Sequence, residues 1–186
     1  MLKGIKFYVV TDSYVDYLRQ FDAKVSFNKA GRPYVGIVLE INARSYFAPL
    51  TSPKPKHDSI RDSLVTIFKL QDVDDLNNKL GMIQINNMIP APTSEVSLLD
   101  FSALDEKYRR LLSKQLKCIK TRQDDIKSRA AKLHRMVSGN PAHVLSKSCC
   151  DFRELEARCA AFEVMLKASN APLAPDAGAA EAVEAG

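Results

Sequence analysis

The sequence has no stretch of the roughly 18 consecutive apolar residues that a helix needs to cross a bilayer. Its first residues, 1–6, also lack the long apolar core of a secretory signal peptide. We therefore expect a cytoplasmic protein that does not associate with membranes.

Cysteine is scarce, and its spacing does not favour cross-links. Cys149 and Cys150 are adjacent and poorly placed to close on each other, so Cys118, Cys159 and this pair are expected to be reduced thiols. No two cysteines have the two-to-four residue gap of a zinc knuckle, and His143 is the only nearby imidazole. A disulfide framework and a zinc site are therefore not expected.

Acidic residues are not grouped as a catalytic metal ion requires. Asp72, Asp74 and Asp75 are close in sequence, but they fall in a predicted turn and are interpreted as ordinary loop acids. We expect neither a metal ion nor another cofactor.

Positive charge is in excess, and its distribution is uneven. The formal charge is +5, and residues 168–186 hold three acids and no Lys or Arg, which leaves +8 on residues 1–167. A basic surface attracts polyanions, of which nucleic acid is the usual one. On charge alone, a basic protein with no such partner is an equal alternative.

The length of 186 residues fits one domain. We expect a single folded unit over 1–167, sheet-rich in 1–101 and helical in 102–167. Residues 168–186 consist mostly of Ala, Pro, Gly and acids, which cannot bury enough apolar area to offset the entropy of ordering. This segment is predicted to be a disordered tail.

Short apolar runs broken by turn residues predict an antiparallel sheet in the first half of an α+β fold. Strands at such spacing favour a small, strongly bent sheet or half-open barrel. A short helix capped by Asp12 or Ser13 is expected after the first strand. The predicted strands are 5–10, 34–41, 44–50 (a hairpin with the preceding one), 64–70, 80–85 and 95–99.

The apolar period changes at about residue 103, where a stripe of leucine, isoleucine and valine predicts one long helix. Ser102 and Asp105 resemble a capping box at its start, and Gly139 is a plausible stop. A second helix is predicted over 152–167, with Asp151 as its cap.

The predicted long helix is unusually basic. Residues 107–135 contain eleven Lys or Arg and two acids, a net of +9. Exposed faces normally mix both signs, so we weigh binding of nucleic-acid phosphates against a merely solvated face. Phosphate contacts would position the nucleic acid without reading its sequence. The candidate RNA-binding residues are Lys114, Lys117, Lys120, Arg122, Lys127 and Arg129 of this helix, together with Lys56 of the sheet-rich half.

The most informative segment is 47–57, where a strand ends in the hydroxyls of Thr51 and Ser52. Prolines then hold Lys54 and Lys56 in a stiff turn that ends at His57. A rigid turn suits a site in which cations must be held in place. By itself, however, the pattern is weak and is more often that of an ordinary loop at the end of a strand.

Several runs of the sequence resemble the ToxN/AbiQ family, the endoribonuclease toxins of type III toxin–antitoxin systems. The similar runs occur in order and at similar spacing over about 5–165. They are IKFY (5–8), RPYVGIVLEI (32–41), YFAPLTSPK (46–54), LGMI (80–83), NMIP (87–90) and LDEKYR (104–109).

This resemblance implies a fold, an activity and partners. The fold would be a bent antiparallel sheet related to the MazF/Kid toxins, with helices around it. The activity would be metal-independent cleavage of cellular or phage RNA, with an abortive-infection role in phage defence. The inhibitor would be a repeated pseudoknot antitoxin RNA that the toxin processes and with which it forms a closed assembly, so no protein antitoxin is expected.

The resemblance also implies an active site made of Lys54, Ser52, Thr51, Arg32 and Tyr14. Some relatives have lysine where this chain has Arg32, so a phosphate contact survives there but proton transfer becomes doubtful, because guanidinium stays charged. RNA is cut without metal when its own 2'-hydroxyl attacks the adjacent phosphate and leaves a 2',3'-cyclic phosphate. Lys54 would compensate the added charge, and the hydroxyls and Arg32 would bind the phosphate.

Two further residues keep alternative interpretations. His57 has an ordinary pKa near neutrality and suits acid–base or substrate-binding work, but an exposed loop histidine is the alternative. Tyr14 is interpreted either as a contact to a base or phosphate or as simple core packing. A noncatalytic RNA-binding regulatory protein is the alternative function.

Overall fold

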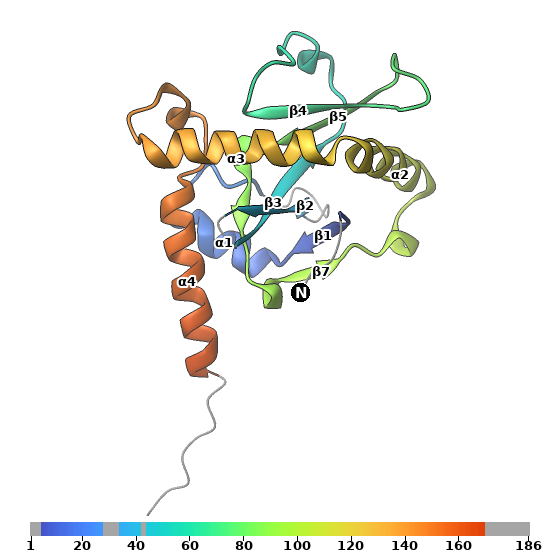
Figure 1. Cartoon of the computed structure of the whole chain (residues 1–186). Helices are drawn as coiled ribbons and strands as arrows, with labels where there is room; N and C mark the ends of the chain where they lie inside the picture. The colour runs from blue at the N-terminus through green and yellow to red at the C-terminus, as the bar shows by residue number, and fades with distance from the viewer. Residues whose placement is uncertain (1–4, 28–33, 42–43, 170–186) are drawn as a thin grey trace, which may run out of the picture.

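The computed structural model describes residues 5–27, 34–41 and 44–169. Arg32, the hairpin loop 42–43 and residues 170–186 of the predicted tail lie outside this part. The chain forms one curled, half-barrel antiparallel sheet with helices around its outside (Figure 1). The predicted α+β class and bent sheet are confirmed.

The sheet has the strand order β4-β5-β3-β2-β1-β7, and β6 also pairs with β3. Its strands are β1 (Phe7–Val10), β2 (Tyr34–Ile41), β3 (Arg44–Thr51), β4 (Ile67–Gln71), β5 (Lys79–Gln84), β6 (Ile89–Pro90) and β7 (Val96–Leu98). The predicted 34–41 matches β2, and the other predicted strands differ from the observed ones at their ends. β6 was not predicted, because a strand of two residues has no readable period.

β3 is the strand on which the sheet turns. One edge pairs with β2, from Gly36 opposite Pro49 to Ile41 opposite Arg44. The other edge changes partner: Tyr46 and Phe47 pair with β6, whereas Leu50 and Thr51 pair with β5. A strand shared in this way must bend, and the bend places the end of β3 at the junction of the two halves of the sheet.

Four α-helices lie within the described residues: α1 (Asp12–Arg19), α2 (Glu106–Thr121), α3 (Gln123–Gly139) and α4 (Phe152–Ser169). The cap of α1 is Thr11, which accepts from the Tyr14 amide, rather than Asp12 or Ser13. Asp151 caps α4 by accepting from the Glu154 amide at 3.1 Å, as predicted. α4 continues to Ser169, so 168–169 are helical and not part of a tail.

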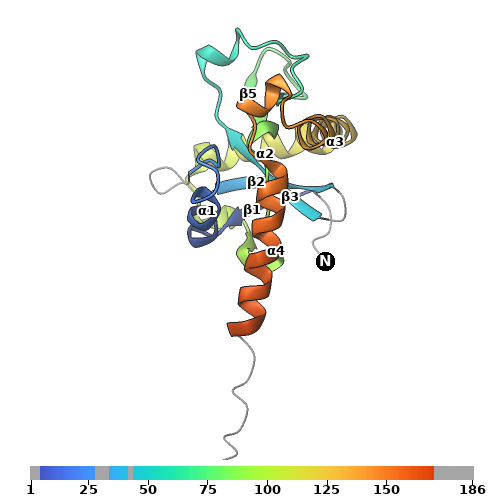
Figure 2. The same cartoon turned by 90° about the vertical axis from the view of Figure 1, so that its left-hand side faces the viewer.

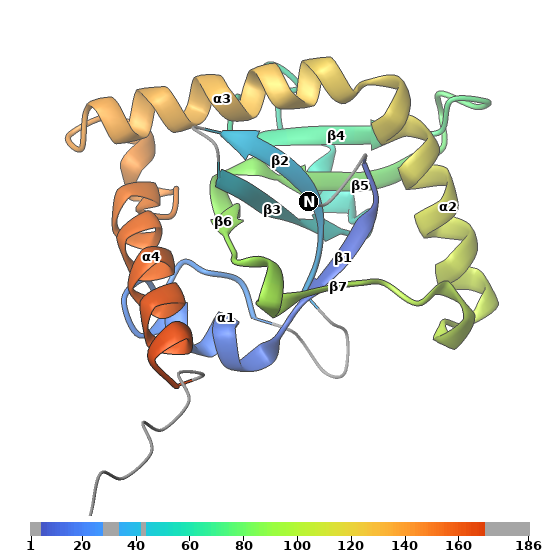
Figure 3. The same cartoon turned by 60° about the horizontal axis from the view of Figure 1, so that its bottom comes forward.

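The prediction of one long helix is wrong. The chain leaves helical geometry at Arg122 (φ −111°, ψ 22°), and α2 and α3 meet there at a sharp angle (Figure 3). α2 packs on β4 and β5, whereas α3 packs on β2 and α4. The apolar stripe continues across the break, since Ile119 and Ile126 are both fully buried. Because the sheet is curved, one straight helix of this length would lose contact with it, whereas two helices joined at an angle remain packed against it.

A buried polar cluster ties the helices to β3. The Glu156 carboxylate of α4 accepts from the Tyr46 hydroxyl at 2.5 Å and contacts the His134 ring of α3 at 2.8 Å. His134 also stacks on Phe152. These contacts hold α4 at its steep angle to α3 (Figures 1 and 2).

The four cysteines are free and buried. Within the described ranges, no group of His, Cys, Asp or Glu is arranged to hold a metal ion. No helix in the same ranges combines the length and apolarity needed to cross a membrane.

Gly81 of β5 has φ +107°, and a Cβ there would lie 1.9 Å from the carbonyl oxygen of Thr51. We expect Gly81→Ala to lower the free energy of unfolding by about 3 kcal/mol, because backbone strain and overpacking each cost about 1–3 kcal/mol. Urea unfolding measures the change.

Gly139→Ala is the matched control, since nothing lies within 4 Å of a Cβ at that position. Its stability should change by less than about 1 kcal/mol. Equal stabilities for the two variants would mean that the close approach of β5 to Thr51 is not a constraint.

Candidate active site

The end of β3 passes into a turn with little freedom. Thr51 donates its hydroxyl to the Met82 carbonyl of β5 at 3.5 Å. After Ser52 and Pro53, Lys54 begins a short 3₁₀ helix (Pro55–His57), and the His57 amide donates to the Lys54 carbonyl at 2.9 Å. The proline at its start is preset for this geometry. The turn is therefore held by β5 on one side and by its own hydrogen bonds on the other.

A groove of about 680 Å³ lies over this turn. The turn forms one wall, the loop after α1 and strand β5 form others, and α2 closes the far side with Tyr108 and Gln115. The structure thus brings together all the candidates that the turn contributes. They are Thr51, Ser52, Lys54, Lys56 and His57.

A second hollow of about 400 Å³ lies beside the groove, and Lys54 and His57 line both. Its other two lysines are paired: Lys69 with Asp62 at 3.0 Å and Lys79 with Asp58 at 2.9 Å. In the described part of the chain, no carboxylate pairs with Lys54. Its exposed ammonium is therefore available to an incoming phosphate.

His57 is not the exposed loop histidine of the alternative interpretation. Its side chain is 7% exposed, and its Nδ1 is buried with no hydrogen-bond partner among the described residues. Burial and the charges of Lys54 and Lys56 lower the pKa of His57 below its usual range. The imidazole is therefore neutral near pH 7.

Tyr14 lies away from the groove, in the core. It is fully buried, its hydroxyl donates to the Pro90 carbonyl at 2.9 Å, and Phe162 packs edge-on against its ring. These contacts favour the packing interpretation. Arg32 lies outside the described residues, so its place relative to Lys54 stays a prediction.

Acids from the turn between β4 and β5 neutralise part of the basic surface of α2. Lys114 contacts Asp72 at 2.6 Å, and Lys117 contacts Asp74 at 2.7 Å. Asp72 is 2% exposed, and the Lys114 hydrogen bond lowers the pKa of its carboxyl. Asp72 and Asp74 thus lie in a turn, as predicted, and the structure adds that each holds a lysine of α2. The sequence signal was an acidic turn in a chain that also carries a basic helix.

The arginines of the basic surface are also engaged. Arg122 pairs with Asp125 at 2.7 Å. Arg129 donates to the carbonyls of residues 62, 64 and 67 and lies over the Phe68 ring. Lys120 and Lys127 are exposed, and neither is paired with an acid in the described ranges. These two keep the predicted role in phosphate binding most directly.

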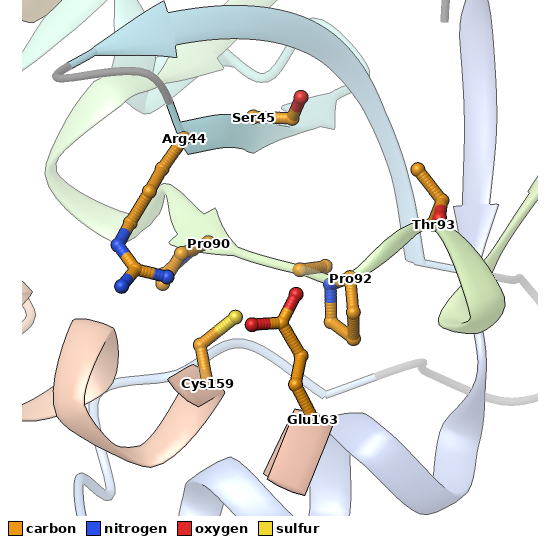
Figure 4. A pocket seen from close by; sticks show the side chains of 8 residues that line it. Arg44, Ser45, Pro90, Pro92, Thr93, Cys159 and Glu163 are labelled. Atoms are coloured by element: carbon orange, nitrogen blue, oxygen red, sulfur yellow. The ribbon is translucent and has the colours of Figure 1, made fainter. Parts of the chain in front are cut away.

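Another cavity, of about 450 Å³, lies between the start of β3, β6 and α4 (Figure 4). Arg44 and Glu163 point toward it from opposite sides, with the Cys159 thiol between them. It contains none of the turn residues. A cation and an acid that face each other do not form a site for a phosphate chain, so we place the candidate active site in the groove over Lys54.

Known proteins are similar to this chain over most of its length. The family model for "Toxin ToxN, type III toxin-antitoxin system" matches residues 6–160. Endoribonuclease ToxN of Bacillus thuringiensis subsp. kurstaki is 38% identical over 165 residues, 83% of this chain and 82% of that protein.

Solved structures are similar as well. AbiQ, a lactococcal anti-phage endoribonuclease of a type III toxin–antitoxin system, superposes with a TM-score of 0.80 at 29% identity, over 87% of this chain and 99% of that one. A second solved structure concerns type III toxin–antitoxin systems and selective toxin inhibition by a non-coding RNA pseudoknot. It superposes with a TM-score of 0.75 at 32% identity, over 87% of this chain and 99% of that one.

The lowered pKa of His57 predicts how stability depends on pH. An unfolded histidine titrates near 6.5, so below about that pH the unfolded chain binds more protons than the folded one. The stabilising contribution of neutral His57 is complete above this value and is lost as the pH falls below it. Thermal unfolding from pH 7.5 to 5 should show this loss in the unmodified protein and a smaller one in His57→Gln. Parallel pH profiles would contradict the prediction.

A lysine of α2 that is paired with an acid and a lysine of α3 that has no acidic partner among the described residues are predicted to have different roles. Lys127→Ala should weaken RNA binding and reduce the slope of log affinity against log salt by about one, as expected for one phosphate contact. Lys114→Ala should change that slope little and lower the melting temperature, because it leaves Asp72 buried without its cation. Filter binding at several salt concentrations and thermal melts of both variants test this assignment, and a reversed pattern would overturn it.

Proposed function

Because the chain belongs to the ToxN family of type III toxin–antitoxin toxins and is an endoribonuclease of that family, we propose that residues 51–57 form its active site and cut RNA without a metal ion. The observation that carries the proposal is the exposed ammonium of Lys54, which has no acidic partner among the described residues and lines one groove together with Ser52 and Thr51.

The chemistry proposed is transesterification within the RNA. The 2'-oxygen of a ribose forms a bond to the adjacent phosphorus, and the bond from phosphorus to the 5'-oxygen breaks. The products are a 2',3'-cyclic phosphate and a 5'-hydroxyl. The proton lost from the 2'-hydroxyl goes to a base, and the departing 5'-oxygen gains one from an acid.

The turn supplies what this reaction needs. Lys54 compensates the negative charge that builds on the phosphate or protonates the departing oxygen, and Ser52 donates a hydrogen bond to the phosphate. Thr51 donates a second one when its hydroxyl turns away from the Met82 carbonyl, which lies 3.5 Å from it. Among the basic side chains of the turn, His57 is the one whose lowered pKa leaves it neutral near pH 7, so it is suited to accept the proton of the 2'-hydroxyl. Arg32 would add a second cation to the phosphate.

The partners are proposed from the same family. The inhibitor is a repeated pseudoknot antitoxin RNA, in line with the relative whose toxin such an RNA inhibits, and it closes with the toxin into one assembly. A role in phage defence follows the anti-phage description of AbiQ. We also propose that the protein acts in the cytoplasm and that its half-barrel is related to the MazF/Kid toxins.

The decisive experiment is on the products. Purified protein incubated with RNA in excess EDTA should cut it and leave 5' ends that polynucleotide kinase labels without prior dephosphorylation. The 3' ends should resist phosphatase until acid opens the cyclic phosphate. RNA that is bound but left intact would support the noncatalytic RNA-binding alternative, and cutting only with added metal would exclude the mechanism.

Two substitutions locate the site. Lys54→Ala and Ser52→Ala should each lower kcat/KM by roughly 100-fold or more, because each removes a group that stabilises the transition state. Neither should change the melting temperature by more than a few degrees, since Lys54 is exposed and Ser52 is half-exposed. Lys167→Ala, an exposed lysine of α4 outside the groove, is the control and should cut normally. Normal cutting by both site variants would remove the turn from the chemistry.

A further inference from the structure

Gln115 of α2 lines the groove and carries an unsatisfied side-chain atom. The residue is 1% exposed and shares the groove lining with Ser52 and Lys54 of the turn. Its Nε2 donates to the Leu80 carbonyl at 2.6 Å, whereas its Oε1 is buried with no partner among the described residues. A carbonyl only accepts, so the bond to Leu80 decides the orientation of the amide. The unused atom is therefore a hydrogen-bond acceptor.

This acceptor is tied structurally to the proposed cleavage turn. Leu80 is followed in β5 by Gly81, whose backbone packs against the carbonyl of Thr51. The same short segment of β5 thus holds both Gln115 and the start of the turn. Ser52, Lys54 and Gln115 also line one groove, whose volume of about 680 Å³ accommodates a nucleotide.

We propose that Gln115 determines sequence preference by accepting a hydrogen bond from the exocyclic amino group of adenine or cytosine beside the cleaved phosphate. The inference rests on the proposed function, because it assumes that RNA lies in this groove. Adenine and cytosine each project an amino donor from the Watson–Crick edge. At the position where adenine and cytosine carry this amino group, guanine and uracil carry a carbonyl oxygen, O6 and O4, which is itself an acceptor and would face the Oε1 oxygen without a hydrogen bond.

Burial makes this acceptor selective. A buried polar atom that receives no donor from the bound base leaves the complex with an unmade hydrogen bond, so a ligand lacking the donor is rejected. Cationic contacts to phosphates cannot make such a distinction, because every nucleotide carries the same phosphate. Gln115 is therefore the groove residue that we expect to read a base.

The first test maps the cuts in a random RNA pool by sequencing the 5'-hydroxyl ends. The unmodified protein should show adenine or cytosine enriched at one position beside the cut. Gln115→Met, similar in volume but without the acceptor, should reduce that enrichment roughly tenfold while cutting continues. Gln123→Met, at the exposed start of α3, is the matched control and should keep the preference.

The second test needs no variant. In an RNA cut at one site, the enriched adenosine is replaced by purine riboside, or the enriched cytidine by its analogue without the 4-amino group. The unmodified protein should lose about tenfold or more in kcat/KM, because one donor is missing. Gln115→Met, where it folds, should cut both RNAs equally well.

Equal cutting of the two RNAs by the unmodified protein would overturn the role of Gln115 and leave the proposed nuclease intact. A preference that persists unchanged in Gln115→Met would do the same. An unmodified protein that cuts no RNA in the pool would instead reject the proposed function, and this inference would fall with it.

Discussion

The close approach of β5 to the end of β3 is the constraint on which the candidate site depends. Gly81 lies so near the Thr51 carbonyl that no side chain fits between them, and its φ of +107° is one that other residues rarely adopt. Because of this contact, Thr51 and Ser52 leave the sheet at one defined place. Lys54 and His57 follow within a proline-braced turn, and α2 is bonded to the adjacent residue of β5 through Gln115. The turn and the wall opposite it are thus built on the same few residues of one strand.

What a charged side chain does in this fold depends on its partners, and the excess of positive charge along a helix does not show it. Two lysines of α2 are paired with acids from the turn between β4 and β5. Arg129 of α3 donates to carbonyls of the loop before β4 and of the first residue of β4. These cations stabilise the packing of the helices on the sheet. Around the candidate site the neighbouring lysines Lys69 and Lys79 are paired as well, whereas Lys54 and Lys56 of the turn have no carboxylate partner among the described residues. The candidate site is therefore distinguished by lysines that remain available to a phosphate.

The elements that local chemistry determines could be predicted from the sequence. Branched and aromatic residues marked β2 and β3, Asp151 marked the start of α4, and the prolines around Lys54 marked a rigid turn. What depends on tertiary contacts was missed. The apolar stripe of α2 and α3 is continuous, so the break at Arg122, which the curved sheet requires, left no mark in the period. The partners of Lys114 and the burial of His57 and Gln115 depend on residues far away in the chain. Tyr14 showed a spacing that suited either a site or a core, and only its contact with Pro90 distinguishes the two.

The segments that line the groove are far apart in the sequence, so the ribosome synthesises them at different times. The loop after α1 and the turn at Lys54 emerge early, the β5 wall follows, and α2 comes only after more than half of the chain has been made. A growing polypeptide therefore carries the candidate turn at Lys54 long before the α2 wall of the groove. If the groove is the site that cuts RNA, as proposed, this order means that a ribosome completes more than half of the chain before the site can close beside the message being translated.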